Sequence, residues 1–184
     1  MTAATIQDHL QVAFRLAKRD QGALDDVANS EAAFWYSFLG MLLSLPFMLI
    51  SITANSDVTL GPLGVLAETS VFIVGWLLFP VAMLEIVRVI DRSQHYFRYV
   101  AASNWCSVLE DGVLTLIVVL RFLEVLPQLF GGLLFFGCIV WVLSFQFFVA
   151  RNALQIDAGT AAVIIGVRLL LSLSLFAVAG IFGG

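Results

Sequence analysis

Three ionisable side chains stand inside long apolar tracts of the sequence. Glu110 and Asp111 interrupt one tract, and Arg168 interrupts the last one. A charge at the centre of a bilayer costs on the order of 3 kcal/mol, so such residues usually face an opposite charge or a wet cavity. We expect Glu110 or Asp111 to pair with Arg168, and the other carboxylate to line a path for an ion or a proton.

A purely structural role for the same charges is the alternative. Neighbouring residues of an α-helix point about 100° apart, so Glu110 and Asp111 cannot both face one arginine well. The three charges would then form a buried ion-pair network that fixes how the helices align. A proton path generally needs a chain of titratable groups. Glu85, which lies close to Arg88 in the sequence, is the further candidate for such a relay.

Other residues offer little chemistry. His9 and His95 fall outside the apolar tracts, so we expect neither a metal site nor a Ser-His dyad inside a membrane. Cys106 and Cys138 lack C-x-x-C spacing and are interpreted as structural thiols. We therefore expect no enzyme and no cofactor. A lipid-modifying enzyme within the membrane is a further hypothesis, and it would need a polar cavity open to one leaflet.

The elements that must hold these charges are predicted from composition. Of the 184 residues, 61% are apolar and 12% are charged, with a mean hydropathy of +1.01. Soluble domains are roughly half apolar and one quarter charged, so this composition is typical of a helical membrane protein. The net charge is -4 and the longest basic run is Lys18-Arg19. We therefore expect the lipid bilayer, and no nucleic acid, as a partner.

The sequence predicts an all-α polytopic transmembrane bundle over residues 31–184. A helical span needs about 20 largely apolar residues, and five tracts qualify, at about 34–52, 69–90, 99–120, 129–150 and 158–182. Pro46 is expected to kink the first span, and residues 53–68 are expected to form a turn-rich loop. The third tract carries both acids, so four spans with this tract in the interface is the competing prediction.

Residues 1–30 are predicted to form an amphipathic helix at the cytoplasmic membrane interface. Ile6, Leu10, Phe14 and Ala17 recur at helical spacing and give one apolar stripe. The basic residues of this segment are mixed with aspartates rather than clustered. A short helix that packs on the bundle in water is therefore the alternative.

The distribution of basic residues predicts the orientation. With five spans, seven of the nine Lys and Arg fall on the side of the N-terminus, Arg121 falls on the other side, and Arg168 lies within the membrane. The seven are Arg15, Lys18, Arg19, Arg88, Arg92, Arg98 and Arg151. The positive-inside rule then predicts a cytoplasmic N-terminus and a periplasmic C-terminus. The very short loops favour a bacterial inner membrane. Four spans give a similar bias, so charge does not decide between the two arrangements.

The order of features resembles the Yip-domain family of five-span membrane proteins over residues 31–184. Two stretches carry the resemblance, the start of the third span (Tyr96, Phe97, Tyr99, Asn104, Trp105) and the start of the last (Ala158, Gly159, Ala161, Ala162). The acidic-Leu-Tyr-Gly-Pro element of that family is absent, and Leu60-Gly61-Pro62 is the nearest stretch. No functional residue is carried over, and Rab binding is not implied.

Two functions follow from these features. The leading hypothesis is a non-catalytic integral membrane protein that organises or associates with other membrane proteins or with copies of itself. It is supported by short loops and by helix faces rich in small residues. The alternative is a small ion or proton translocator that uses Glu110, Asp111 and Arg168, with Glu85 as a relay.

Overall fold

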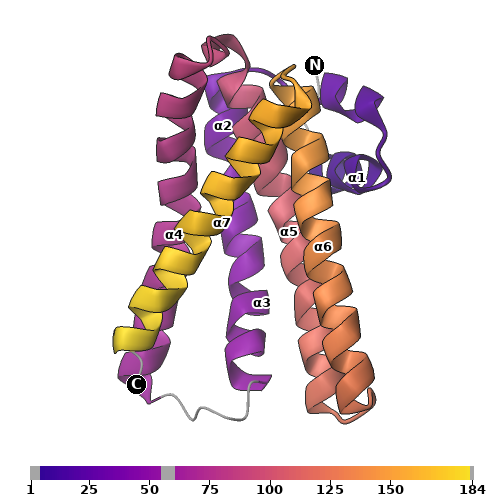
Figure 1. Cartoon of the computed structure of the whole chain (residues 1–184), viewed down its shortest axis with the longest axis vertical. Coiled ribbons are helices and arrows are strands. Elements are labelled where there is room, and N and C mark those ends of the chain that lie inside the picture. The colour runs from indigo at the N-terminus through magenta and orange to yellow at the C-terminus, as the bar shows by residue number, and fades with distance from the viewer. Residues whose placement is uncertain (1–4, 55–60, 183–184) are drawn as a thin grey trace.

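The computed structural model describes residues 5–54 and 61–182, except for the side chains of residues 179–182, and every regular element in this part is a helix (Figure 1). The long helices run along the long axis of the molecule. The elements are α1 (Ile6–Ala17), η1 (Gln21–Asp26), α2 (Glu31–Ser37), α3 (Leu39–Ala54), α4 (Pro62–Val89), η2 (Ser93–His95), α5 (Tyr96–Phe122), α6 (Gln128–Ala153) and α7 (Ala158–Phe182). The predicted helical bundle is confirmed.

Within the part of the chain that the structure describes, four helical segments are long and apolar enough to cross a membrane. They are Glu31–Ala54, which joins α2 and α3, then α4, α6, and Ala158–Val178 of α7. Their mean hydropathies lie between 1.9 and 2.3. This makes the chain compatible with an integral membrane protein, because an apolar helix satisfies its own backbone hydrogen bonds in lipid.

The fifth long helix, α5, occupies the interior of the bundle. It packs against α3, α6, α2 and α1, and all residues from Tyr99 to Cys106 are buried. A helix segment that is enclosed by protein does not need an apolar exterior. This explains why Ser103 and Asn104 are tolerated in the first half of α5, whereas the second half exposes Val113, Leu116 and Phe122.

The helix boundaries correct two details of the sequence prediction. The first span is interrupted at Phe38, between α2 and α3. Pro46 lies within α3, and the kink expected there stays a prediction. The predicted loop 53–68 is wrong from Pro62 onward, because α4 already begins there. Proline suits the first turn of a helix, where its missing N–H is not needed. Asn55-Ser56-Asp57 lie outside the described residues.

The helix α1 lies across the bundle rather than along it (Figure 1). A capping box with Thr5 and Asp8 starts it, and it packs on α5 through buried Ala13 and Leu16. His9 stacks on Trp105 with 4.9 Å between ring centroids. Burial at this contact lowers the pKa of His9, because the imidazolium loses hydration.

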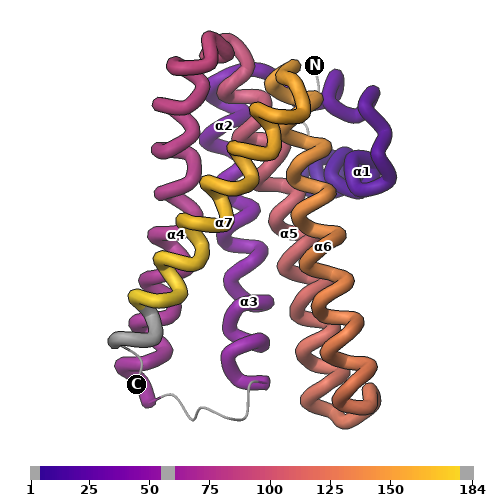
Figure 2. The backbone as a smooth tube through the Cα atoms, in the orientation of Figure 1, coloured from indigo at the N-terminus to yellow at the C-terminus, as the bar shows by residue number. Residues whose placement is uncertain are grey.

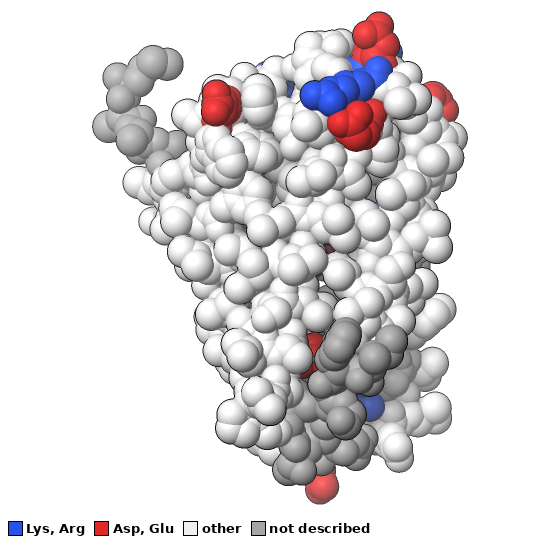
Figure 3. Space-filling model, turned by 90° about the vertical axis from the view of Figure 1, so that its left-hand side faces the viewer, with Lys and Arg blue, Asp and Glu red and all other residues white. Residues whose placement is uncertain are grey.

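The connections gather at the two ends of the bundle. The α4–α5 and α6–α7 turns share one end with α2, and the α5–α6 turn lies at the other (Figure 2). Asp91, Glu124 and Gln155 adopt positive φ in these turns, which ends each preceding helix at a polar residue. On the face seen in Figure 3, charged side chains gather at the α4–α5 end, above a broad band almost free of them.

Candidate functional site

Arg168 of α7 is the centre of a polar cluster inside the bundle. Its Nη1 donates to Ser103 Oγ at 2.9 Å and to Gln146 Oε1 at 3.2 Å, and its Nη2 donates to Ser107 Oγ at 3.1 Å. The same Nη2 lies 4.0 Å from Glu110 Oε2. The guanidinium is therefore hydrogen-bonded on both of its terminal nitrogens and lies beside one carboxylate.

Helical spacing brings the α5 members of this cluster together. Ser103, Ser107 and Glu110 follow one another at steps of four and three residues, which places them on one face of a helix. Gln146 reaches them from α6 and Arg168 from α7. The cluster thus ties three helices to each other with polar contacts, where the surrounding packing is apolar.

The hydrogen bonds of the cluster run in one direction and end at Glu110. Arg168 donates to Ser103, the Ser103 hydroxyl donates to Gln146 Oε1 at 3.1 Å, and Gln146 Nε2 donates to Glu110 Oε1 at 2.6 Å. An ionised carboxylate can only accept, so it suits the end of such a chain. The Glu110 side chain is 5% exposed, and the protein itself supplies its partners.

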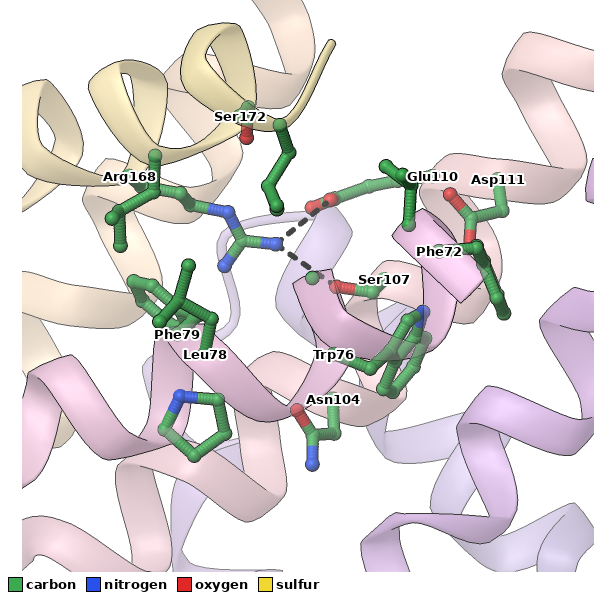
Figure 4. A pocket seen from close by; sticks show the side chains of 15 residues that line it. Phe72, Trp76, Leu78, Phe79, Asn104, Ser107, Glu110, Asp111, Arg168 and Ser172 are labelled. Carbon is green, nitrogen blue, oxygen red and sulfur yellow. Dashed lines mark hydrogen bonds and ion pairs between the residues drawn. The ribbon is translucent and has the colours of Figure 1, made fainter. Parts of the chain in front are cut away.

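A partly open cavity of about 260 Å³ adjoins the cluster, between α4, α5 and α7 (Figure 4). Arg168 forms part of its wall and lies over the Phe79 ring, with 4.6 Å from Cζ to the ring centroid. Trp76 and Phe72 of α4 contribute further aromatic surface, and Leu171 of α7 contributes aliphatic surface. The cavity wall therefore combines charged side chains with aromatic and aliphatic ones.

Asp111 also lines this cavity but does not join the Arg168 cluster. Figure 4 shows Glu110 directed toward Arg168 and Asp111 turned toward Phe72, as their separation around the helix requires. Among the described residues, no ion pair to the Asp111 carboxylate is present. The Ser44 hydroxyl of α3 is near enough to donate to it and has no other hydrogen-bond partner. Asp111 thus adds a negative charge that no basic side chain of the described residues pairs with.

Asn104 presents its amide oxygen to the same cavity. The Ser37 hydroxyl donates its one hydrogen to the Phe34 carbonyl at 2.7 Å, so its oxygen can only accept from Asn104 Nδ2 at 2.9 Å. This fixes the amide with its nitrogen toward Ser37 and its oxygen toward the cavity (Figure 4). Asn104 is 5% exposed, and no described residue donates to that oxygen.

Glu85 lies apart from this site. It is on α4, its side chain is 69% exposed, and its Oε1 pairs with Arg88 Nη1 at 2.6 Å. It does not line the cavity. Of the four residues singled out in the sequence, Glu110, Asp111 and Arg168 are therefore brought together, and Glu85 is not.

Sequence reasoning did not select Gln146, Ser103 and Ser107, although they provide most of the hydrogen bonds to Arg168 and Glu110. A usable signal existed for Gln146, because it is an amide inside a strongly apolar tract and must find a partner there. Serines give no such signal, since a membrane helix satisfies their hydroxyls from its own carbonyls. Ser107, for example, donates to the Ser103 carbonyl at 3.1 Å.

The described residues contain no group of three or more His, Cys, Asp and Glu that could hold a metal ion. Comparison with known proteins adds no assignment: no family model, no curated protein and no solved structure matches the chain. The resemblance to the Yip-domain family therefore stays a prediction. What the chain does must be inferred from the cavity and the charges around it.

Proposed function

We propose that this chain is a non-catalytic integral membrane protein with five spans that translocates a proton or a small cation through the cavity beside Asp111. One observation carries the proposal: Asp111 lines a cavity among the spans and has no ion pair among the described residues. Glu110 and Arg168 offset each other, so the charge of Asp111 is left over. A carboxylate at this depth needs a proton or a cation as its partner.

The five-span arrangement is part of this proposal. Its support is the length of α5, which at 1.5 Å per residue is about 40 Å, and its packing along α3 and α6. Glu110 and Asp111 then lie about 21 Å from the start of this helix, near its middle. A four-span arrangement would place the same acids at the membrane surface, where they would need no partner.

The proposed orientation has the N-terminus in the cytoplasm of a bacterial cell and α1 in the inner leaflet interface. In its support, Arg88, Arg92 and Arg151 flank the turns at the end shared with α2, and Arg121 flanks the α5–α6 turn at the other end. The positive-inside rule assigns the more basic end to the cytoplasm. The helix α1, which exposes Phe14 while lying across the bundle, suits an interface.

A flux measurement with Asp111→Asn tests the proposed function. The purified chain is reconstituted in liposomes, a membrane potential is imposed, and uptake of protons or of sodium or potassium is followed. We expect flux in the parent protein and a fall of at least about tenfold in Asp111→Asn, because a neutral amide cannot take up the proton or balance the cation. The exchange is nearly isosteric, so folding should be preserved.

Glu85→Gln is the matched control, since it also neutralises one acid of the chain but lies outside the cavity. It should leave the flux unchanged. Equal flux in the parent and in Asp111→Asn, or no flux in the folded parent for any of these ions, would contradict the proposed function.

Association with other membrane components is a second candidate function. Gly132 and Gly137 of α6 and Gly166 of α7 favour it, because a side chain built at any of them meets nothing within 4 Å in the described chain. Small residues on open faces of membrane helices let another helix approach closely.

A further inference from the structure

Several hydrogen-bond acceptors that face the cavity have few or no hydrogen-bond partners in the described chain. They are the Asn104 amide oxygen, whose orientation Ser37 fixes, the Asp111 carboxylate, which has the Ser44 hydroxyl near it, and Glu110 Oε2, which lies 4.0 Å from Arg168. Acceptors inside a protein are expected to have partners. A molecule in the cavity that carries several donors would satisfy these acceptors together.

The donors of the cavity wall do not bond to these acceptors in the described structure. The terminal nitrogens of Arg168 are directed to Ser103, Gln146 and Ser107, and the Ser107 hydroxyl donates to a backbone carbonyl. Trp76 and Ser172 also line the cavity with one polar hydrogen each, and neither is hydrogen-bonded to Asn104, Glu110 or Asp111. An occupant with N–H or O–H groups of its own would therefore find acceptors to bond. Because Asp111 leaves one negative charge uncompensated, the occupant best suited to the site also carries one positive charge.

The remaining wall of the cavity is mainly apolar. Phe72 and Trp76 form a ring pair with centroids 6.1 Å apart, and Leu171 and Leu175 of α7 line the cavity as well. A volume of about 260 Å³ lies just below the range of roughly 300–1,000 Å³ found for pockets of larger organic ligands. It far exceeds the roughly 30 Å³ share of one water molecule, so it has room for a small organic cation as well as for a hydrated metal ion.

We propose that the cavity binds a small primary ammonium ion with a short alkyl chain. The ammonium group has three N–H donors and one charge, and it would lie among Asn104, Glu110 and Asp111. The alkyl chain would lie between the Trp76 ring and the leucines of α7. Aromatic rings also favour cations over their faces, and Arg168 over Phe79 already forms such a contact on this wall. The inference rests on the proposed function and names its cargo.

Binding of n-butylammonium to the purified full chain, followed by isothermal titration calorimetry in detergent, tests this inference. Tetramethylammonium, which has the same charge and no N–H, should bind at least about tenfold more weakly, because it cannot satisfy the acceptors. Butanol, which has the same alkyl chain without the charge, should bind at least about tenfold more weakly as well. Asp111→Asn should lose the binding of butylammonium, and Glu85→Gln should keep it.

The outcomes separate this inference from the proposed function. If the parent protein carries protons or sodium or potassium in an Asp111-dependent way but does not bind butylammonium, the inference fails and the proposed function stands. If butylammonium and tetramethylammonium bind equally, the donor argument is wrong. If butylammonium binds equally to the parent and to Asp111→Asn, it binds elsewhere and the inference is also wrong. If the folded parent neither carries an ion nor binds butylammonium, both proposals fall.

Discussion

The two adjacent acids of α5 have different surroundings, although nothing in their sequence separates them. Glu110 accepts from Gln146 and lies beside Arg168, so its charge is part of the packing between α5, α6 and α7. Asp111 faces the cavity and has no such partner in the described part of the chain. A substitution at either site therefore tests a different property, stability at Glu110 and ion binding at Asp111.

Replacing Arg168 with Met should destabilise the fold. Removing one partner of a buried pair leaves the other charge uncompensated, which typically costs on the order of 3 kcal/mol. We expect a clearly lower midpoint of thermal unfolding in detergent, measured by gel filtration of heated samples. The double variant Arg168→Met, Glu110→Gln should unfold at a higher temperature than the single one, since Glu110 then no longer leaves a buried charge without its partner. A single variant as stable as the parent would show that the pair adds nothing to the fold.

The charged members of the site could be predicted from the sequence, and the neutral members could not. Glu110, Asp111 and Arg168 are conspicuous because ionisable groups are rare in apolar tracts. Their partners Ser103 and Gln146 depend on which helix faces are turned inward, and α5 has too little periodicity to reveal this when it is buried on nearly all sides. The separation of Glu110 from Asp111 followed from helical geometry alone.

At the scale of elements, α5 does not meet the hydropathy criterion for a membrane span, yet it packs against several other helices. A hydropathy threshold selects helices whose surfaces suit lipid, and the first half of α5 is instead enclosed by other helices of the bundle. The boundaries of most other helices were predicted to within a few residues. The exceptions are α4, which Pro62 starts early, the first span, which Phe38 divides, and residues 1–30, where α1 ends at Ala17. The error at α4 arose because Gly61-Pro62 was interpreted as part of a turn, whereas it starts a helix.

Cysteine labelling tests whether α5 crosses the membrane. In a background without Cys106 and Cys138, single cysteines replace the exposed residues Gln94, Glu124 and Gln155, which lie in successive turns. With five spans, an impermeant maleimide added to intact cells should label only the cysteine at position 124. The cysteines at positions 94 and 155 should react after the membrane is permeabilised.

The four-span arrangement gives a different pattern. There α5 would not cross, so position 124 would stay protected and position 155 would be labelled from outside. The residue at position 94 is the internal control, because both arrangements place it in the cytoplasm. Labelling of position 155 in intact cells would therefore contradict the five-span proposal and the depth of the cavity with it.

At the scale of the whole molecule, some glycines are packed against a neighbouring helix and others lie on an open surface of the bundle. Gly40 of α3 is packed, because a side chain there would lie 3.1 Å from Val108 and 3.2 Å from the Asn104 carbonyl oxygen. Gly132 and Gly137 of α6 meet no neighbour. Gly40 lets α3 approach α5 closely. Gly132 and Gly137 could play the same role only toward a helix outside this chain.

Gly132→Leu should therefore weaken association without affecting the fold. If α6 packs on another membrane protein or a second copy, blue-native electrophoresis after mild extraction should show a complex for the parent and mainly the lone chain for the variant. The unfolding midpoint should stay unchanged, since position 132 is exposed and a Cβ there meets no atom of the described chain. Val81→Leu, at an exposed position of α4, should keep the complex. A lone chain in the parent protein would contradict the association.

The interruption at Phe38 has a consequence for how the cavity could be controlled. Ser37, the residue just before it, holds the Asn104 amide in place, and Ser37 belongs to α2, whose first turn is capped by Ser30 outside the apolar tract. The neighbouring Asn29 bonds to the backbone of Gln94 and Arg98, at the α4–α5 turn. Bending at this point would withdraw the Ser37 oxygen, free the amide to rotate, and exchange an acceptor for a donor in the cavity. The position of α2 would then determine which occupant the cavity prefers.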